Sequence, residues 1–168
     1  KRLDNIIKTS KSIISFLESN KAEVFITKDL EDIFPELPII DFENKETTPE
    51  ILISLGGDGT FLRASHYAVK NDIPVLGVNL GYIGFLTNVE EEEILSSIDK
   101  ILEEKYKIEE RTILKGTLLR EGKEILSDIA INDFVIQRDP SEKIIQTSVF
   151  INDNRVATNR GDGIIIST

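Results

Sequence analysis

The chain has 168 residues, enough for one ordinary domain or for one domain and part of a second. Its net charge of −10 argues against nucleic acid or an anionic membrane as a partner, because either would require a basic surface. Cysteine is absent, which excludes a disulfide framework and a thiolate metal site. No apolar run approaches the ~20 residues of a membrane helix, and the start does not resemble a signal peptide. A cytoplasmic protein is therefore expected.

In the first half of the chain, helix-like and strand-like segments alternate. The pattern predicts helices over 2–19, 61–70 and 90–104, strands over 22–27, 51–55 and 73–79, and a loop over 34–49. Such alternation is typical of a Rossmann-like parallel sheet with crossover helices. Folds of this type usually open with a strand, so we expect a leading strand to be missing from the chain.

From about residue 108 the sequence becomes rich in β-branched residues, and its strand-like runs are separated by turn signals at Glu121-Gly122 and Asn152-Asp153-Asn154. The expected strand segments are 111–120, 124–137, 144–151 and 155–168. We therefore predict an α/β domain over residues 1–107 and an all-β domain, a β-sandwich, over residues 108–168. The last run has nothing to cap it, so the second domain is expected to be incomplete.

The strongest local signal is the string Gly56-Gly57-Asp58-Gly59-Thr60, which follows a buried strand and precedes a helix. Glycines at the carboxyl edge of a parallel sheet let the backbone approach a phosphate or a ribose, and the helix N-terminus attracts an anion. A carboxylate there repels phosphate unless it has a chemical role. Asp58 can accept a proton from an attacking hydroxyl or hold a bridging magnesium ion. The alternative is structural: Asp58 caps the helix and the glycines form a tight turn.

This glycine turn resembles the one shared by NAD kinases, 6-phosphofructokinases, and the diacylglycerol and sphingosine kinases. By itself it predicts a phosphotransferase and does not name the acceptor. Three further segments are similar to NAD kinase motifs, in the same order: Gly77–Thr87, Ala130–Asp133 and Arg160–Thr168. The resemblance extends from about residue 50 to the last residue.

The residues in these segments have binding chemistry of their own. Phe85 can offer an aromatic surface to an adenine ring, or it can be part of the core. Asn132 and Asp133 can grip ribose hydroxyls or a base edge if they lie at a strand end, or they can form a polar turn. Arg160 and Asp162 could share one side of an extended segment and contact a pyrophosphate and a nicotinamide-side group. Alternatively, they form a structural ion pair.

The resemblance to NAD kinases implies that NAD is the phosphate acceptor, through its adenosine 2′-hydroxyl, and that ATP is the donor. Asp58 would accept the proton, and the amide of Gly59 would contribute to binding. Arg63, one turn into the following helix, could meet a phosphate. Lys143 falls where family members carry a basic or histidine contact, although it can also be an exposed loop lysine. The resemblance further implies a homodimer or homotetramer.

A dedicated metal site is not expected. No cluster of histidine and carboxylates has metal-ligand spacing, so any metal is expected to be Mg²⁺ carried in with ATP. Two other functions stay open at this point. One is a lipid or sugar kinase that uses the same glycine turn, and the other is a non-catalytic dinucleotide-binding module.

Overall fold

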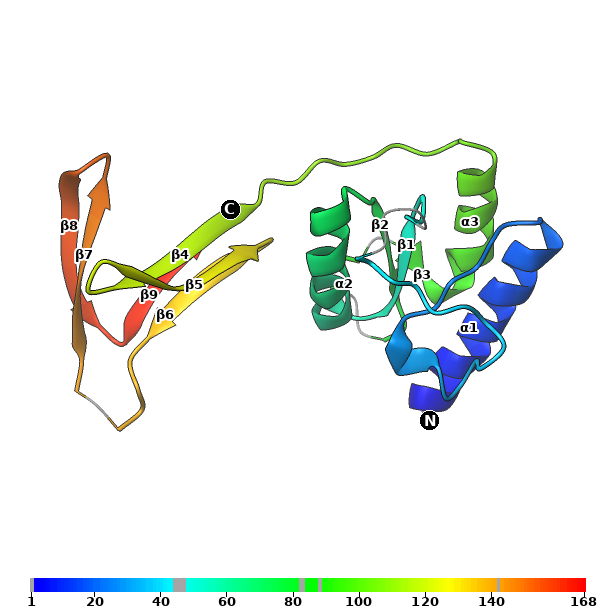
Figure 1. The fold of residues 1–168 in the computed structure, drawn as a ribbon, viewed down its shortest axis with the longest axis horizontal. Coiled ribbons are helices and arrows are strands. Elements are labelled where there is room, and N and C mark those ends of the chain that lie inside the picture. Colours follow the sequence, from blue (N-terminus) through cyan, green and yellow to red (C-terminus); the bar gives the residue numbers. More distant parts are fainter. Residues whose placement is uncertain (1, 44–47, 82–83, 88, 142) are drawn as a thin grey trace. The chain divides into compact units, whose positions relative to one another are not determined.

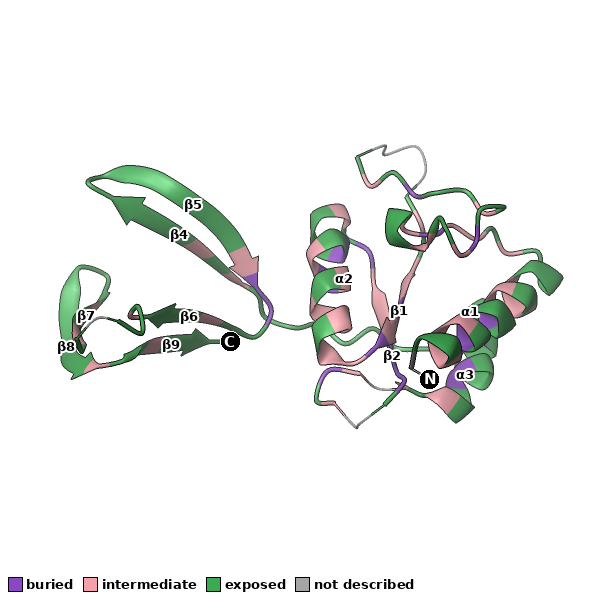
Figure 2. Cartoon of the chain, turned by 90° about the horizontal axis from the view of Figure 1, so that it is seen from below, coloured by how far each residue is buried: buried purple, intermediate pink, exposed green. Residues whose placement is uncertain are grey.

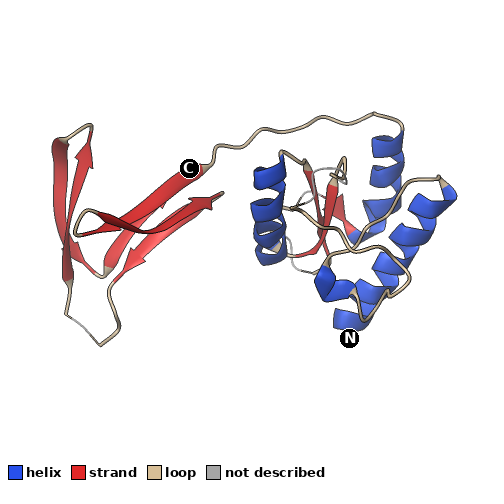
Figure 3. Cartoon of the chain, viewed as in Figure 1, coloured by secondary structure: helices blue, strands red, loops and turns tan. Residues whose placement is uncertain are grey.

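The computed structural model describes residues 2–43, 48–81, 84–87, 89–141 and 143–168. The chain divides into two compact units, Lys1–Glu109 and Glu110–Thr168. Helices occur in the first unit, and the second is built from strands (Figure 3). Four positions in the predicted loop over 34–49 and two in the segment Gly77–Thr87 lie outside the described residues.

The first unit is a parallel sheet with helices on both faces. Its elements are α1 (Arg2–Ser19), η1 (Lys28–Leu30), β1 (Leu52–Gly56), α2 (Asp58–Asn71), β2 (Val75–Asn79), β3 (Val89–Glu90), η3 (Glu91–Glu93) and α3 (Ile94–Leu102). Within the described residues the sheet has the order β1-β2-β3, and both neighbouring pairs are parallel. α2 covers one face of this sheet, while α1 and α3 cover the other (Figure 1). The predicted Rossmann-like fold class is confirmed.

Strand alternation explains how the two faces are covered. Ile53 of β1 and Val78 of β2 pack on the face that meets α1 and α3, where Ile13 and Ile98 complete a buried cluster. On the opposite face, the ring of Phe61 in α2 lies against Gly77, where a Cβ would come within 2.7 Å of it. Small residues in the strands therefore bring α2 close to the sheet.

Two predicted elements of the first unit differ in the structure. The strand expected over 22–27 is reduced to a single bridge between Ile26 and Ile39, because Pro38 has no N–H to extend the ladder and η1 follows directly. The helix expected over 90–104 begins later, at Ile94. The preceding residues Val89 and Glu90 pair with β2 as strand β3.

Glu91 fastens α1 to the segment before α3. Its Oε2 accepts a hydrogen bond from Asn5 Nδ2 and its Oε1 accepts one from Thr9 Oγ1, each at 2.8 Å. These bonds, chiefly that from Asn5 and then that from Thr9, lower the pKa of the Glu91 carboxyl below its ordinary value, with a smaller contribution from Lys8. The ionised form of Glu91 therefore stabilises this helix packing.

The second unit consists of antiparallel strand pairs, as predicted for this half of the chain. Its strands are β4 (Leu114–Arg120), β5 (Lys123–Ala130), β6 (Asp133–Gln137), β7 (Ile145–Ile151), β8 (Asn154–Gly161) and β9 (Gly163–Ser167), and they pair as β4-β5, β6-β9 and β7-β8. The hairpin turns have positive φ at Glu121 and Gly122 and at Asn152 and Asp153, which suits two-residue connections.

Two predicted strands of this unit are each divided by a corner. The run over 124–137 breaks at Ile131 and Asn132 into β5 and β6, and the run over 155–168 breaks at Asp162 into β8 and β9. In each case the chain leaves a hairpin, β4-β5 or β7-β8, and the strand that adjoins it belongs to the pair β6-β9. Apolar burial in this unit is slight, since most of its residues are exposed (Figure 2).

None of the helices in the described part of the chain has the length and apolar character that crossing a bilayer demands.

Ile98 tests the core of the first unit. Its side chain is 1% exposed, so Ile98→Ala should lower the free energy of unfolding by about 2–5 kcal/mol through lost burial and a cavity. Leu95→Ala on the same helix is the control, because Leu95 is 38% exposed and should cost less than about 1 kcal/mol. Urea unfolding measures both, and equal losses would contradict this packing.

Glu91 makes the stability depend on pH. Because its pKa is lowered on folding, its contribution is complete above the ordinary value of 4.5 and is lost as the pH falls through the lowered value. Glu91→Gln should lose about 1 kcal/mol at pH 7 and show a smaller further loss in acid than the wild type. Urea unfolding across this pH range, with exposed Glu92→Gln as control, provides the measurement. If Glu91→Gln lost as much stability in acid as the wild type does, the hydrogen bonds of Glu91 to α1 would not be the cause of the pH dependence.

Candidate functional site

The glycine turn joins the carboxyl end of β1 to the first turn of α2. Gly56 closes β1 with φ +156°, and a Cβ there would lie 2.5 Å from Thr60 Oγ1, so the turn itself requires a glycine. Gly57 is the N-cap residue, and its carbonyl accepts hydrogen bonds from the N–H groups of Thr60 and Phe61 at 2.9 and 3.1 Å. The motif thus forms the beginning of the helix, three residues earlier than the predicted start at 61.

The other two glycines of the turn have no packing reason to lack a side chain. A Cβ at Gly57 or Gly59 would meet nothing within 4 Å, and neither residue has positive φ. Their absent side chains leave room beside the backbone of the first helical turn, where N–H groups and the helix dipole favour an anion. This is the geometry that a phosphate-binding turn requires.

Asp58 is held by the loop that follows β2. Its Oδ2 accepts a hydrogen bond from the Phe85 N–H at 3.0 Å, and its Oδ1 accepts one from the Leu86 N–H at 3.1 Å. Gly84 lies directly against the carboxylate, because a Cβ on it would be 2.7 Å from the carboxylate carbon. The half-buried Asp58 therefore joins the start of α2 to the Gly84–Leu86 segment. Its carboxylate lies at the sheet edge where ligands of α/β folds bind.

The Phe85 side chain is exposed to solvent, although its backbone N–H is bonded to Asp58. Leu86 is buried at 7% exposure, whereas Phe85 is 96% exposed. The alternative that Phe85 belongs to the core of this unit is therefore wrong. A large aromatic ring held in solvent by a fixed backbone is a surface for another planar group.

A cavity of about 290 Å³ lies elsewhere at this edge of the sheet. It is lined by Asn79 at the end of β2, by Leu80 and Gly81 after it, and by Glu90–Glu92. Asp58 is not among its lining residues, and its acidic wall would repel a polyphosphate. The cavity is therefore less suited to an anionic ligand than the start of α2, where the helix dipole favours negative charge. Arg63, which is exposed on α2 one turn beyond Gly59, is on the same helix as that turn.

In the second unit, Asn132 and Asp133 occupy the corner between β5 and β6. Both are exposed, and the Asn132 carbonyl accepts a hydrogen bond from the Thr168 N–H at 3.0 Å. A strand end is the position from which neighbouring side chains can reach one ligand. The paired strands fix this corner, since Asp133 lies opposite Ser167 in the β6-β9 register.

Asp162 adjoins the other end of this strand pair, about 14 Å away by the rise of β6, and Arg160 precedes it on β8, opposite Gln146 of β7. The chain bends at Asp162 between β8 and β9, so the two residues do not lie on one continuous strand, and their contact with a common ligand stays a prediction. Asp162 also has a different partner: Arg138 Nε donates to its Oδ1 at 2.6 Å. Lys143 is exposed in the connection between β6 and β7.

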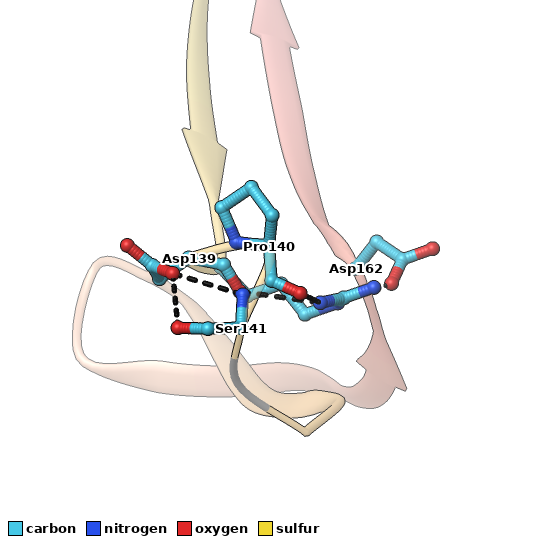
Figure 4. A network of polar contacts seen from close by, with 5 residues as sticks. Asp139, Pro140, Ser141 and Asp162 are labelled. Carbon is cyan, nitrogen blue, oxygen red and sulfur yellow. Dashed lines mark hydrogen bonds and ion pairs between the residues drawn. The ribbon is translucent and has the colours of Figure 1, made fainter.

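Arg138 is the residue of this region that sequence reasoning missed. Its Nη1 also donates to the carbonyls of Asp139 and Pro140, each at 3.1 Å, and its backbone N–H donates to the Asp162 carbonyl at 2.9 Å. Figure 4 shows the surrounding network, in which Asp139 accepts hydrogen bonds from the hydroxyl and N–H of Ser141. These bonds, the hydroxyl's first, lower the pKa of the Asp139 carboxyl. No local motif marks Arg138, because its partner is 24 residues away.

Among the described residues, no group of three or more histidine, aspartate or glutamate side chains is arranged to hold a metal ion. Mg²⁺ usually binds through one or two carboxylates and substrate phosphates. A single carboxylate beside a phosphate-binding turn, as at Asp58, fits that mode of binding.

Comparison with known proteins identifies a family for this chain. The model of the ATP-NAD kinase N-terminal domain matches residues 4–106. The chain is 39% identical over 167 residues to an NAD kinase of Lachnoclostridium phytofermentans, covering 98% of this chain and 58% of that protein. It is 33% identical over 166 residues to an NAD kinase of Natranaerobius thermophilus, with the same two coverages. The chain thus spans about half the length of the curated relatives it matches.

Solved structures show the same fold. Yeast NADH kinase complexed with NADH matches with a TM-score of 0.84 and 19% identity, over 96% of this chain and 53% of that one. An NAD kinase from Archaeoglobus fulgidus in complex with ATP matches with a TM-score of 0.55 and 23% identity, over 85% and 58%. At 19% and 23% sequence identity, these matches show that the fold is shared.

Gly84→Ala tests the contact between the loop and Asp58. The new methyl group would overlap the carboxylate, so the variant should lose about 1–3 kcal/mol of stability and expose the Phe85 and Leu86 amides to faster hydrogen exchange. Gly81→Ala is the matched control in the same loop, because a Cβ there meets nothing within 4 Å. If both variants exchanged like the wild type, Gly84 would not support the carboxylate.

Proposed function

The chain belongs to the NAD kinase family, and we propose that the protein transfers the terminal phosphoryl group of ATP to the adenosine 2′-hydroxyl of NAD, forming NADP. The observation that carries this proposal is the Asp58 carboxylate, which is fixed by two backbone N–H groups at the start of α2. It lies next to Gly57 and Gly59, whose missing side chains leave space for a ligand.

Asp58 acts as the proton acceptor in this proposal. As the ribose oxygen forms its bond to the terminal phosphorus, the bond from that phosphorus to the bridging oxygen breaks and ADP leaves. The hydroxyl proton passes to Asp58. A carboxylate has about four lone-pair positions, and the Phe85 and Leu86 N–H groups use one on each oxygen. The remaining positions can accept the hydroxyl, and the two N–H groups hold the carboxylate in a fixed orientation.

The first turn of α2 supplies positive charge for the proposed phosphoryl transfer. Phosphoryl transfer depends mainly on alignment and on neutralising the charge of the phosphoryl oxygens. The amide of Gly59 and the helix dipole provide partial positive charge there, and Arg63 adds a full charge one turn further on. Mg²⁺ entering with ATP would supply the remaining neutralisation.

Phe85 provides the contact with the adenine of NAD. Its ring is 96% exposed while its backbone is fixed by Asp58, so stacking would cost little ordering of the loop. The same carboxylate thereby links the position of the adenine to the position of the base that acts on its ribose.

In the second unit we assign Asn132 and Asp133 to the hydroxyls or base of the dinucleotide, and Arg160 and Asp162 to its pyrophosphate and nicotinamide side. Asn132 and Asp133 are exposed at a strand corner, which suits two neighbouring side chains that reach one ligand. Lys143 is assigned as an additional basic contact.

The proposed domain roles follow from these assignments: residues 1–107 carry the phosphoryl-transfer turn, and residues 108–168 contribute to NAD binding. A cytoplasmic location and a homodimer or homotetramer belong to the same proposal, supported by composition and by the family resemblance. The yeast relative was solved with NADH and the Archaeoglobus relative with ATP, which supports the pair of ligands proposed here.

A coupled assay for NADP formation from NAD and ATP tests the function directly. Parallel reactions with diacylglycerol and fructose 6-phosphate as acceptors measure the competing kinase activities of the same glycine turn. NADP formation alone is the expected result. NAD binding without consumption of ATP would instead indicate a non-catalytic dinucleotide-binding module and would refute the proposal.

Asp58→Asn tests the base. The amide cannot accept the ribose proton, so kcat for NADP formation should fall by about 10²–10⁴-fold. The amide also places an NH₂ group against one of the two loop N–H groups, so a moderate loosening of Phe85 is expected as well. Isothermal titration should show NAD affinity reduced by less than about tenfold.

Two controls separate these effects. Asp72→Asn changes an exposed aspartate at the other end of α2, where the residue has φ 55°, a conformation that asparagine tolerates, so it should be silent. Gly84→Ala disturbs the loop but keeps the carboxylate. Near wild-type turnover in Asp58→Asn would exclude Asp58 as the base.

A further inference from the structure

We propose that Arg138 is a positioning residue for the dinucleotide site, which fixes the corner between β8 and β9 that carries Asp162 and follows Arg160 by two residues. This inference rests on the proposed function, because it concerns how the second unit presents its part of the NAD-binding residues. Arg138 is not itself assigned a contact with the ligand.

The side chain of Arg138 joins two segments that are distant in sequence. Its Nε donates to Asp162 Oδ1 at 2.6 Å, at the corner between β8 and β9. Its Nη1 donates to the carbonyls of Asp139 and Pro140, each at 3.1 Å, in the connection after β6. The backbone N–H of Arg138 donates to the Asp162 carbonyl at 2.9 Å. The Asp162 corner is thus held through both its side chain and its main chain.

The segment Asp139–Pro140, whose carbonyls accept hydrogen bonds from Arg138, is ordered by a local turn. Asp139 Oδ1 accepts the Ser141 N–H at 2.9 Å and the Ser141 hydroxyl at 2.5 Å (Figure 4). This arrangement is an Asx turn, which fixes the backbone around Pro140. The carbonyls that accept from the guanidinium are therefore positioned by bonds other than those to Arg138.

The chemistry of these acceptors favours a guanidinium. Three oxygens from two segments lie around one side chain, and the planar fork of arginine can donate to all of them from fixed positions. A lysine ammonium has the same charge but would lose the geometry of the fork. The Arg138 side chain is 27% exposed, so it is more confined than a free surface arginine.

The two glycines on either side of Asp162 have different surroundings. At Gly163 a Cβ would overlap the Ile136 carbonyl oxygen, so this side of the corner is pressed against β6. At Gly161 a Cβ would meet nothing within 4 Å, so the side next to Arg160 is open. Arg138 therefore holds the corner at Asp162, between a packed glycine and an open one, and we expect a ligand to approach on the open side.

The contact should matter more for binding than for stability. The Asp162 side chain is 78% exposed, and ion pairs in water contribute little to folding. Orientation of binding groups, however, changes affinity even when the fold is unaffected. A role limited to folding and a positioning role therefore predict different measurements.

Arg138→Lys is the test, with steady-state kinetics of NADP formation on the full chain. We expect the KM for NAD to rise about tenfold, while kcat and the KM for ATP change less than about twofold and the urea midpoint is nearly unchanged. Hydrogen exchange should become faster at residues 161–163. Arg155→Lys on β8 is the matched control, because Arg155 lies at the opposite end of that strand and should leave every quantity unchanged.

A double-mutant cycle with Asp162→Asn completes the test. If Arg138 acts through Asp162, then Arg138→Lys should have little further effect on the KM for NAD in the Asp162→Asn background. Fully additive effects, or an Arg138→Lys variant with wild-type KM, would overturn the positioning role while leaving the NAD kinase function intact. A wild-type protein that binds no NAD would overturn both.

Discussion

The two hydrogen bonds from the Phe85 and Leu86 N–H groups to the Asp58 carboxylate connect the parts of the first unit on which its chemistry depends. They join the start of α2 to the loop after β2, so the helix N-terminus, the carboxylate and the backbone that carries the exposed Phe85 ring have fixed relative positions. Gly84 is part of the same constraint, because any side chain there would meet the carboxylate. One acidic residue thus serves the local structure and the proposed proton transfer, and both roles require the same orientation.

Glycine occurs in this protein for two distinct physical reasons. At Gly56 and Gly163 a side chain would clash with the protein itself. Gly56 lies in a tight turn, and Gly163 lies against a neighbouring strand. Gly57, Gly59 and Gly161 have no such reason, since a Cβ on any of them would meet nothing within 4 Å. What they share is a place in a motif that the proposal assigns to nucleotide binding. At these three positions the proposal gives ligand approach, and not packing, as the reason for glycine.

The parts of the fold that the sequence predicted are those governed by local rules. Helix periodicity, strand alternation and turn residues identified α1, the parallel sheet and the two hairpin turns. β3 was missed because Val89-Glu90 precedes more glutamates and reads as a helix start, while its strand conformation comes from pairing with β2. The link between Arg138 and Asp162 was missed for a similar reason. It joins residues 24 positions apart, and no periodic pattern encodes a contact made at the corner of two sheets.

The negative charge of the chain must be reconciled with the proposed binding of ATP and NAD. At physiological ionic strength repulsion between exposed charges is screened beyond about 8 Å, so the groups near the phosphate decide the balance. In the first turn of α2 the acidic residue is Asp58 itself. Both of its oxygens accept backbone N–H dipoles, which offset part of the charge that would otherwise face the phosphate. The loop contacts thus allow a carboxylate to stand beside a phosphate-binding helix terminus, which it must do if it is to take the proton of the attacking hydroxyl.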